Sequence, residues 1–172
     1  MKLRFGESTI ADWATQYRIT RKEPELLALR PTVRRGGFLT KAQLAQLARW
    51  KSPRSAPRVA RNSDAYVREI TGFALGARDE RARIESLTLL DGVQCPTASV
   101  VLHLFHEEPY PLLDYRAVWS VQASQPKHYT FPFWLEYVQF CRSVAEKASV
   151  DMRTLDRALW QFSKANQPSA KA

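Results

Sequence analysis

One segment, residues 90–114, limits the fold of this chain more than any other part of it. It opens with Leu-Asp-Gly-Val at residues 90–93 and continues into an apolar stretch, in which Pro96 suits the first turn of a helix because proline lacks an N–H that would have no partner there. The buried stripe of this helix is predicted to contain Ala98, Val101, Leu102 and Phe105. The segment therefore predicts two helices joined by a tight hairpin.

Most of the remaining chain also shows helical spacing, and sustained alternation of apolar and polar residues, which is typical of strands, is hard to find. Helices are predicted over about residues 8–17, 40–50 and 63–75, and a further helix after a cap at Asp79 carries Ile84 and Leu87 toward the core. Residues 34–37 and 51–58 are expected to interrupt them. In the helix over 63–75, one face is predicted to contain Tyr66, Ile70 and Phe73.

Two helices are predicted near the C-terminus. The first is indicated by Trp134, Val138, Cys141 and Ala145, and the second, after a cap at Ser149 or Asp151, by Met152, Leu155, Leu159 and Phe162. The expected fold class is all-α, a compact domain of roughly seven to nine helices containing a helix-hairpin-helix motif. We predict one domain over 1–165, with a basic part at 1–68, hairpin and acid at 79–120, C-terminal helices at 131–165 and a frayed tail at 166–172.

Length and composition narrow the classes of protein. A chain of 172 residues with 45% hydrophobic residues can bury a core. No stretch approaches the ~18 apolar residues that span a bilayer, and no secretory signal is recognisable, so we expect no membrane partner. The expected oligomeric state is a monomer, although no sequence feature determines it. The expected location is intracellular, in the cytoplasm with the nucleoid, and not secreted. Cys95 and Cys141 are too few for a disulfide framework and are expected to be buried thiols.

The net charge of +9 is concentrated in the N-terminal part. Residues 1–68 contain 15 Lys and Arg against 5 Asp and Glu, and no acid occurs between Glu25 and Asp64. This excess of positive charge attracts a polyanion, and counterions are released when the polyanion binds. A nucleic acid is the expected partner, although a solvated face or an acidic protein partner would also account for the composition.

The hairpin and a later acid form a candidate site. A turn at Gly92 and Val93 would direct backbone N–H groups and the N-terminus of the next helix outward, where a phosphate can accept them. Pro109 and Pro111 turn the chain back, and Leu112 and Leu113 precede Asp114. An acid after an apolar pair tends to be partly desolvated, which tunes its basicity. A compact helical hairpin and a helix N-cap would explain the same residues without any function.

These residues resemble the helix-hairpin-helix superfamily of base-excision DNA glycosylases. The resemblance covers about residues 90–119, in which residues 90–93 match the hairpin, Thr97 and Ala98 match the small pair after it, and Asp114 has the separation of the catalytic acid. It implies double-stranded DNA as partner and Asp114 as the catalytic carboxylate, acting on a base rotated out of the duplex. It also implies that the phosphate backbone is bound by Gly92, Val93, Gln94, Pro96 and Thr97.

The resemblance further implies a monofunctional enzyme without lyase activity. Bifunctional members carry a lysine where this chain has Pro96, and no lysine occurs between Lys51 and Lys127. Water would then attack the sugar while Asp114 stabilises the oxocarbenium-like centre or orients that water. No cofactor is expected, because an iron–sulfur cluster needs four suitably spaced cysteines and the chain has two. The hairpin stays compatible with a monovalent cation.

Other parts of the expected site are implied more loosely. The segment that fills the gap left by an extruded base, a wedge, is predicted among Lys51, Ser52, Arg54, Arg58 and Arg61, which a mobile loop would also explain. Candidate residues for the base pocket are Tyr110, Tyr115 and Trp119, although aromatic residues at helical spacing are more often core. His103 and His106 are expected to be packing or surface residues.

Some features depart from the family pattern. Gln94 replaces a second hairpin glycine, no glycine follows Gly92, and the chain from Ser52 to the hairpin has room for only two helices, so the base pocket is expected to be abbreviated. The main alternative is therefore a non-catalytic DNA-binding module with the same motif. A basic adaptor that binds protein or RNA is the third hypothesis.

Overall fold

The structure, a computed structural model, describes residues 1–20, 22–123 and 126–168. Over these residues it contains helices and turns but no strand, which confirms the all-α prediction. The helices of the described ranges are α1 to α11, more than the seven to nine expected, because short helices occupy segments that the sequence predicts as breaks. No helix of this part of the chain is both long and apolar enough to cross a bilayer.

The residues group into two compact units, each with its own helices and buried side chains. Unit 1 comprises Met1–Arg18 and Pro111–Ala172, and unit 2 comprises Ile19–Tyr110. The hairpin therefore belongs to unit 2, whereas Asp114 belongs to unit 1. The single domain expected over residues 1–165 stays a prediction.

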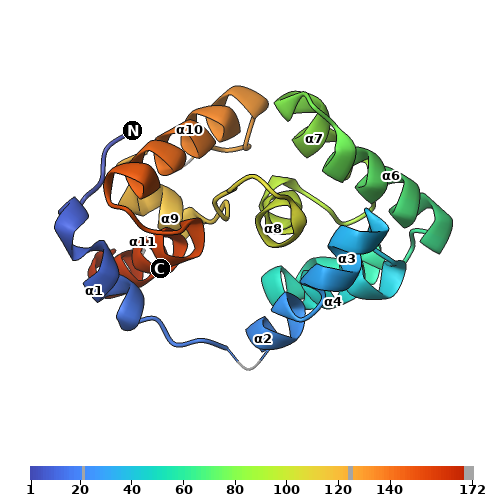
Figure 1. The fold of residues 1–172 in the computed structure, drawn as a ribbon, viewed down its shortest axis with the longest axis horizontal. Coiled ribbons are helices and arrows are strands. Elements are labelled where there is room, and N and C mark those ends of the chain that lie inside the picture. The colour runs from blue at the N-terminus through green and yellow to red at the C-terminus, as the bar shows by residue number, and fades with distance from the viewer. Residues whose placement is uncertain (21, 124–125, 169–172) are drawn as a thin grey trace. The chain divides into compact units, whose positions relative to one another are not determined.

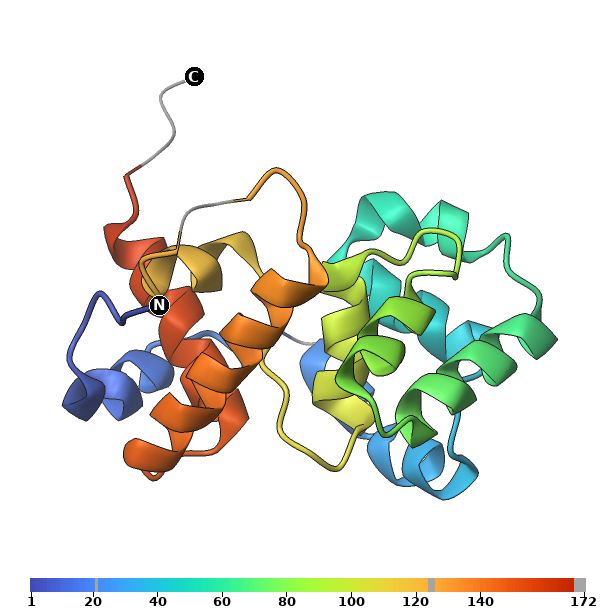
Figure 2. The same cartoon turned by 90° about the horizontal axis from the view of Figure 1, so that it is seen from above.

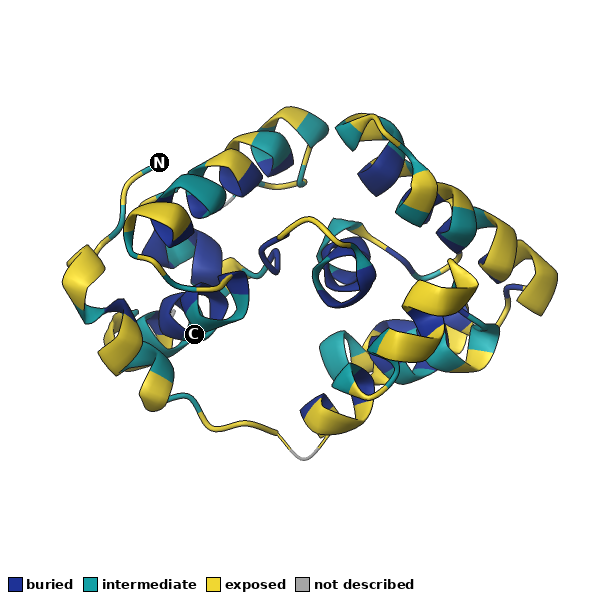
Figure 3. Cartoon of the chain, viewed as in Figure 1, coloured by how far each residue is buried: buried dark blue, intermediate teal, exposed yellow. Residues whose placement is uncertain are grey.

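Unit 2 is built around one apolar helix. Its helices are α2 (Lys22–Leu27), α3 (Arg30–Gly36), α4 (Lys41–Lys51), α5 (Ala56–Val59), α6 (Asp64–Gly76), α7 (Glu80–Leu87) and α8 (Cys95–Phe105), with a 3-10 turn η2 at Pro53–Ser55. Within this unit α8 packs against α3, α4 and α7 (Figure 1). Every residue of α8 from Thr97 to Phe105 except His103 is buried, which gives the helix its dark blue colour in Figure 3. The predicted stripe of α8 is confirmed.

Polar side chains begin the longer helices of unit 2. Asp79 accepts the backbone N–H of Ala82 at 2.8 Å, so its predicted role as the cap of α7 is confirmed. Thr40 and Gln43 form a reciprocal capping box at the start of α4. These caps satisfy N–H groups that have no partner within the helix, and they explain why α4 and α7 begin close to where the sequence predicts.

The face of α6 predicted to contain Tyr66, Ile70 and Phe73 lies away from the core. Tyr66, Ile70 and Phe73 share a face, but Tyr66 and Phe73 are 38% and 57% exposed, so this face is not the core face. The buried residues are Val67, Thr71 and Ala74. Thr71 can be buried because its hydroxyl donates to the carbonyl of Val67 at 2.7 Å and accepts the N–H of Leu39 at 2.9 Å. Small and β-branched residues also allow α7 to pack closely against α6.

Two predicted interruptions are wrong in part. Residues 34–36 complete α3, and the chain leaves the helix only at Gly37, whose φ of 74° is left-handed. Residues 53–59 form η2 and α5 instead of an open loop. The prolines of these segments occupy first-turn positions of η2 and α5, where a missing N–H costs nothing, and so they start helical turns rather than prevent them.

Unit 1 places α11 against three other helices. Its elements are a 3-10 turn η1 (Glu7–Thr9), α1 (Ile10–Thr15), α9 (Tyr115–Ser120), α10 (Phe131–Lys147) and α11 (Met152–Asn166). Helix α11 packs against α1, α9 and α10, and Figures 1 and 2 show α10 and α11 side by side. Helix α1 is shorter than the helix predicted over 8–17.

The two C-terminal helices agree closely with the sequence patterns. All four predicted core residues of α10 are buried, and in α11 Met152, Leu155 and Leu159 are buried while Phe162 is half-buried. Of the two predicted caps, Asp151 is the N-cap, since it accepts the N–H of Thr154 at 2.8 Å. Helix α11 ends at Asn166. Of the predicted frayed tail, residues 169–172 lie outside the described residues.

Candidate nucleic-acid interface

The α7–α8 hairpin (residues 88–94) presents backbone amides at the start of α8. Gly92 adopts a left-handed φ of 78°, and the N–H of Val93 closes the turn on the carbonyl of Leu90 at 3.0 Å. Gln94 is the N-cap of α8 and makes no side-chain cap hydrogen bond. Within the described residues no oxygen accepts the N–H of Gly92 or Gln94. Together with the positive end of the α8 dipole, these two donors suit an anion.

The predicted phosphate-binding residues differ in what they can offer. Val93 and Thr97 are buried, and so they anchor the hairpin in the core of unit 2. Gln94 is exposed, and Gly92 and Pro96 are half-buried. Pro96 lies in the first turn of α8, as predicted, and it has no N–H to donate. Any contact with an anion at this turn is therefore made by main-chain groups and by Gln94.

The hairpin is in close contact with the basic segment (residues 51–61). A Cβ added at Gly92 would lie 2.8 Å from the carbonyl oxygen of Ser55 and 2.8 Å from the backbone nitrogen of Val59. It would also lie 2.9 Å from the Cβ of Arg58. Such distances leave no room for a side chain, and the left-handed φ independently favours glycine. Gly92 thus allows the basic segment and the hairpin to form one surface.

The buried side chain of Asn62 links these two segments. Its Nδ2 donates to the carbonyl of Val59 at 2.9 Å and to the carbonyl of Asp91 at 3.1 Å, while its Oδ1 accepts the N–H of Asp91 at 2.9 Å. One neutral amide therefore joins the end of the basic segment to the hairpin turn by three hydrogen bonds. The sequence analysis did not identify Asn62, because a lone asparagine before a helix is most often a local cap.

Three arginines of the basic segment are solvent-exposed. Arg54, Arg58 and Arg61 all belong to η2, α5 or the turn that follows, and none has a carboxylate partner within the described residues. Lys51 and Ser52 are half-buried. The predicted wedge segment is helical and lies against the hairpin, and its role as a wedge stays a prediction.

Asp114 is the N-cap of α9 in unit 1. Its Oδ1 accepts the N–H of Arg116 at 2.9 Å, and its side chain is half-buried. Pro111, Leu112 and Leu113, which precede it, are buried as expected. The structure thus shows the helix cap that the sequence allowed.

Two buried side chains hold the acid segment (residues 111–114). The N–H of Leu112 donates to Oδ1 of Asp156 at 3.0 Å, and the carbonyl of Leu112 accepts the hydroxyl of Tyr137 at 3.2 Å. Burial raises the pKa of Tyr137 well above its ordinary value, and the charges of Cys141 and Asp156 add to this shift. Burial likewise raises the pKa of Cys141. The sequence did not reveal Asp156, because it interrupts an apolar stripe without any motif.

The aromatic residues predicted for a base pocket differ in their surroundings. Tyr110 belongs to unit 2 and is buried, and its hydroxyl hydrogen-bonds Arg83 and donates to Glu80 at 2.7 Å. Tyr115 is 51% exposed, and Trp119 is half-buried under Arg4. Tyr129, which the sequence analysis missed, is half-buried in unit 1; desolvation and the charge of Asp114 raise its pKa. The base-pocket role of the three predicted residues stays a prediction.

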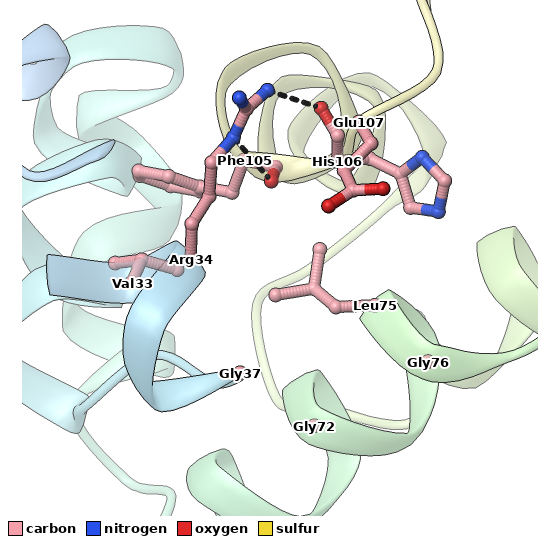
Figure 4. A pocket seen from close by; sticks show the side chains of 9 residues that line it. All are labelled: Val33, Arg34, Gly37, Gly72, Leu75, Gly76, Phe105, His106 and Glu107. Carbon is pink, nitrogen blue, oxygen red and sulfur yellow. Dashed lines mark hydrogen bonds between the residues drawn. The ribbon is translucent and has the colours of Figure 1, made fainter. Parts of the chain in front are cut away.

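A pocket of about 300 Å³ lies elsewhere in unit 2 (Figure 4). It is lined at the C-terminal ends of α3, α6 and α8, and a Cβ added at Gly37 or Gly76 would meet no atom within 4 Å. Arg34 occupies one wall, where its guanidinium donates to the carbonyls of Phe105 at 3.3 Å and His106 at 2.9 Å. The pocket adjoins the end of α8 opposite to the hairpin, so it is not part of the proposed anion site.

The histidines of α8 have structural partners. Nδ1 of His103 lies 2.6 Å from the carbonyl oxygen of Tyr110, and the ring of His106 packs edge-on against that of Tyr110. Burial lowers the pKa of His106, with the charge of Arg83 adding to the effect. Among the described residues, no three His, Cys, Asp or Glu side chains gather to hold a metal ion. Cys95 is half-buried and Cys141 buried, and both are free thiols.

Comparisons with known proteins do not assign this chain to a family. No family model matches the chain, and no curated protein matches it. One similar solved structure is the Methanocaldococcus jannaschii 8-oxoguanine glycosylase/lyase in complex with a 15mer DNA containing 8-oxoguanine. The identity is 14%, the TM-score is 0.49, and the match covers 95% of this chain and 82% of that one. A likeness of this size does not by itself assign a family or an activity.

Proposed function

We propose that this protein binds duplex DNA through the α7–α8 hairpin and the basic segment, and that it removes a damaged or mismatched base as a monofunctional member of the helix-hairpin-helix glycosylases. The observation that carries the proposal is the hairpin itself. Two backbone donors without an acceptor in the described chain lie at the N-terminus of α8, directly against a segment with three exposed arginines. A phosphate satisfies these donors and the positive charge at once.

In this proposal Asp114 supports the chemistry on the sugar. The Asp114 carboxylate, which also caps α9, stabilises positive charge at the sugar or orients the attacking water. The N-glycosidic bond breaks with its electron pair leaving on the base, and water adds to the sugar carbon, where its hydroxyl stays while its proton passes by way of solvent to the departing base. Because Pro96 cannot act as an amine nucleophile, no covalent Schiff base is part of the reaction.

The catalytic proposal is tested by Asp114→Asn. Asparagine caps a helix about as well as aspartate, so α9 should stay folded. We expect single-turnover base release to fall at least about 100-fold while duplex affinity changes only a few-fold. Asp12→Asn, which removes an exposed carboxylate of the same unit, is the matched control and should release base at the wild-type rate. Equal release by both variants would remove Asp114 from the reaction.

The binding proposal is tested separately by Gln94→Glu. A carboxylate near the first turn favours the α8 dipole but repels a phosphate, so binding should weaken without loss of fold. Gln139→Glu, an exposed position of α10, makes the same charge change away from the hairpin. The duplex affinity of both variants is measured by fluorescence anisotropy. The duplexes carry different lesions, among them 8-oxoguanine, uracil and alkylated purines.

The absence of a covalent intermediate is tested on the same duplexes. Borohydride should trap no protein–DNA adduct on any of them.

A non-catalytic DNA-binding module is the second candidate. It is favoured by the use of Asp114 as a helix cap, which explains this acid without any reaction. For such a module, duplex binding depends on Gln94 as above, but no lesion in the panel is released.

A further inference from the structure

Helix α11 carries a stripe of cationic and aromatic residues on the face opposite to its core. Arg153, Arg157, Trp160 and Lys164 follow one another at intervals of four, three and four residues, which places them on one side of the helix. The other side holds the buried Met152, Leu155, Leu159 and Ser163. The stripe is therefore a second basic feature of the chain, in unit 1 and outside the basic segment of the sequence.

One guanidinium and one aromatic ring from outside α11 join this stripe. The guanidinium of Arg116 lies 5.5 Å from the ring centroid of Trp160, and Nζ of Lys164 lies 5.2 Å from it. The ring of Tyr17 packs edge-on against Trp160 at 5.4 Å, with Arg153 and Arg157 at 5.6 and 5.8 Å from its own centroid. These six residues, Tyr17, Arg116, Arg153, Arg157, Trp160 and Lys164, are named the Trp160 cluster.

The charges of the cluster are only partly balanced by acids. Within the described residues, neither Arg116 nor Lys164 forms an ion pair with a carboxylate. The charge of Arg157 interacts with that of Asp151, the N-cap of α11. Asp156 lies on the buried side of the helix. Cations stacked on rings gain on the order of 0.5–1 kcal/mol each at exposed sites, and they lose less side-chain entropy when they bind an anion.

We infer that the Trp160 cluster binds phosphates of the DNA strand next to the nucleotide that reaches Asp114. This inference rests on the proposed function. The link to the site is Arg116, whose guanidinium belongs to the cluster while its backbone N–H binds the Asp114 carboxylate. A strand that presents a sugar to Asp114 brings its neighbouring phosphates to the same end of α9. The hairpin and the Trp160 cluster are then two separate anion sites, one in each unit.

The test compares two lysines of unit 1. Lys164→Gln removes an exposed charge of the cluster, and Lys147→Gln removes an exposed charge at the end of α10, outside it. Duplex affinity is measured by anisotropy at several salt concentrations. We expect Lys164→Gln to lower the slope of log affinity against log salt by about 1 and Lys147→Gln to leave it unchanged. Both side chains are exposed, so Lys147→Gln should unfold at the wild-type temperature and Lys164→Gln should lose no more than about 1 kcal/mol of stability with its cation–π contact.

A second variant separates charge from positioning. Trp160→Leu keeps every cation but removes the ring on which Arg116 and Lys164 rest. We expect the salt slope to stay constant while affinity falls about two- to fivefold. If Trp160 only stabilises the fold, Trp160→Leu should lower thermal stability and leave duplex affinity unchanged. That result would overturn the inference that the ring positions Arg116 and Lys164 for DNA binding.

The outcomes distinguish the inference from the proposed function. If Lys164→Gln and Lys147→Gln behave alike while Gln94→Glu still weakens binding, the Trp160 cluster is not a DNA contact and the proposed function stands. If the wild-type protein shows no salt-dependent duplex binding, both fail. If polyglutamate competes for the cluster as well as DNA does, an acidic protein partner replaces the strand and the inference is overturned.

Discussion

The hairpin of unit 2 and the acid segment of unit 1 reach fixed geometries by different means. Gly92 packs directly against main-chain atoms of the basic segment, and the neutral side chain of Asn62 completes the contact. In contrast, the acid segment is held by Asp156 and Tyr137, two buried side chains that can ionise. The hairpin is thus fixed by close main-chain contact and a neutral amide, whereas the acid segment is fixed by hydrogen bonds to buried side chains that can ionise.

Gly92→Ala should have the largest effect. The added Cβ meets backbone atoms at 2.8 Å in a left-handed conformation, so we expect a loss of about 3 kcal/mol or more in the free energy of unfolding. Gly76→Ala, at a glycine with open space around it, should change stability by no more than about 1 kcal/mol. Urea denaturation measures both. Similar stabilities of the two variants would show that the hairpin is not in close contact with the basic segment.

Asp156→Ala is expected to rank second. It leaves the N–H of Leu112 without its acceptor in a buried place, which costs about 1–3 kcal/mol. Asp156→Asn retains an oxygen that can accept this N–H and should be milder. Base release by the Asn variant should therefore stay closer to that of wild type than release by the Ala variant. If Asn is as damaging as Ala in both measurements, the charge of Asp156 matters and its hydrogen bond to Leu112 does not.

Asn62→Ala should cost about 1–2 kcal/mol, because the turn at Asp91 loses two hydrogen bonds to this amide. Asn166→Ala, which removes an exposed amide at the end of α11, should remain within about 0.5 kcal/mol of wild type. Duplex affinity should fall only for the Asn62 variant. Unchanged duplex affinity together with lower stability would show that Asn62 stabilises the fold but does not position the hairpin for DNA binding.

Alkaline pH should have the smallest effect, and it should act on unit 1. Burial raises the pKa values of Tyr137 and Cys141 above their ordinary values of 10.0 and 9.0. The folded chain therefore keeps these two protons at pH values where the unfolded chain has released them. Stability is therefore fully present well below pH 9, and it falls as pH rises through the ordinary pKa of the thiol and then of the phenol.

The double variant Tyr137→Phe, Cys141→Ala should flatten this dependence in urea denaturation at pH 7 to 10. Cys95→Ala is the control in unit 2, where burial also raises the pKa of a thiol, but this thiol is only half-buried and its contribution should be smaller. A pH dependence that follows Cys95 instead would reverse the comparison between the two units.

The stripes of apolar residues predicted most of the helices, because a helix that buries one face must repeat its apolar residues at helical spacing. This holds for α8, α10 and α11, and the caps at Asp79 and Asp151 could be predicted because a side-chain oxygen before a helix has a local partner. On α6 the spacing identified the face shared by Tyr66 and Phe73, but periodicity alone does not say which face meets the core, and this one is exposed.

By itself, the sequence determined the all-helical class, the turn at Gly92 and the position of Asp114 at the start of a helix, because each depends on residues close together in the chain. Only the tertiary structure decided that Asn62 binds the hairpin turn from 29 residues away, that Asp156 holds Leu112 from 44 residues away, and that α11 gathers cations around Trp160. Such contacts depend on which helices pack together, and a local pattern carries no information about that choice.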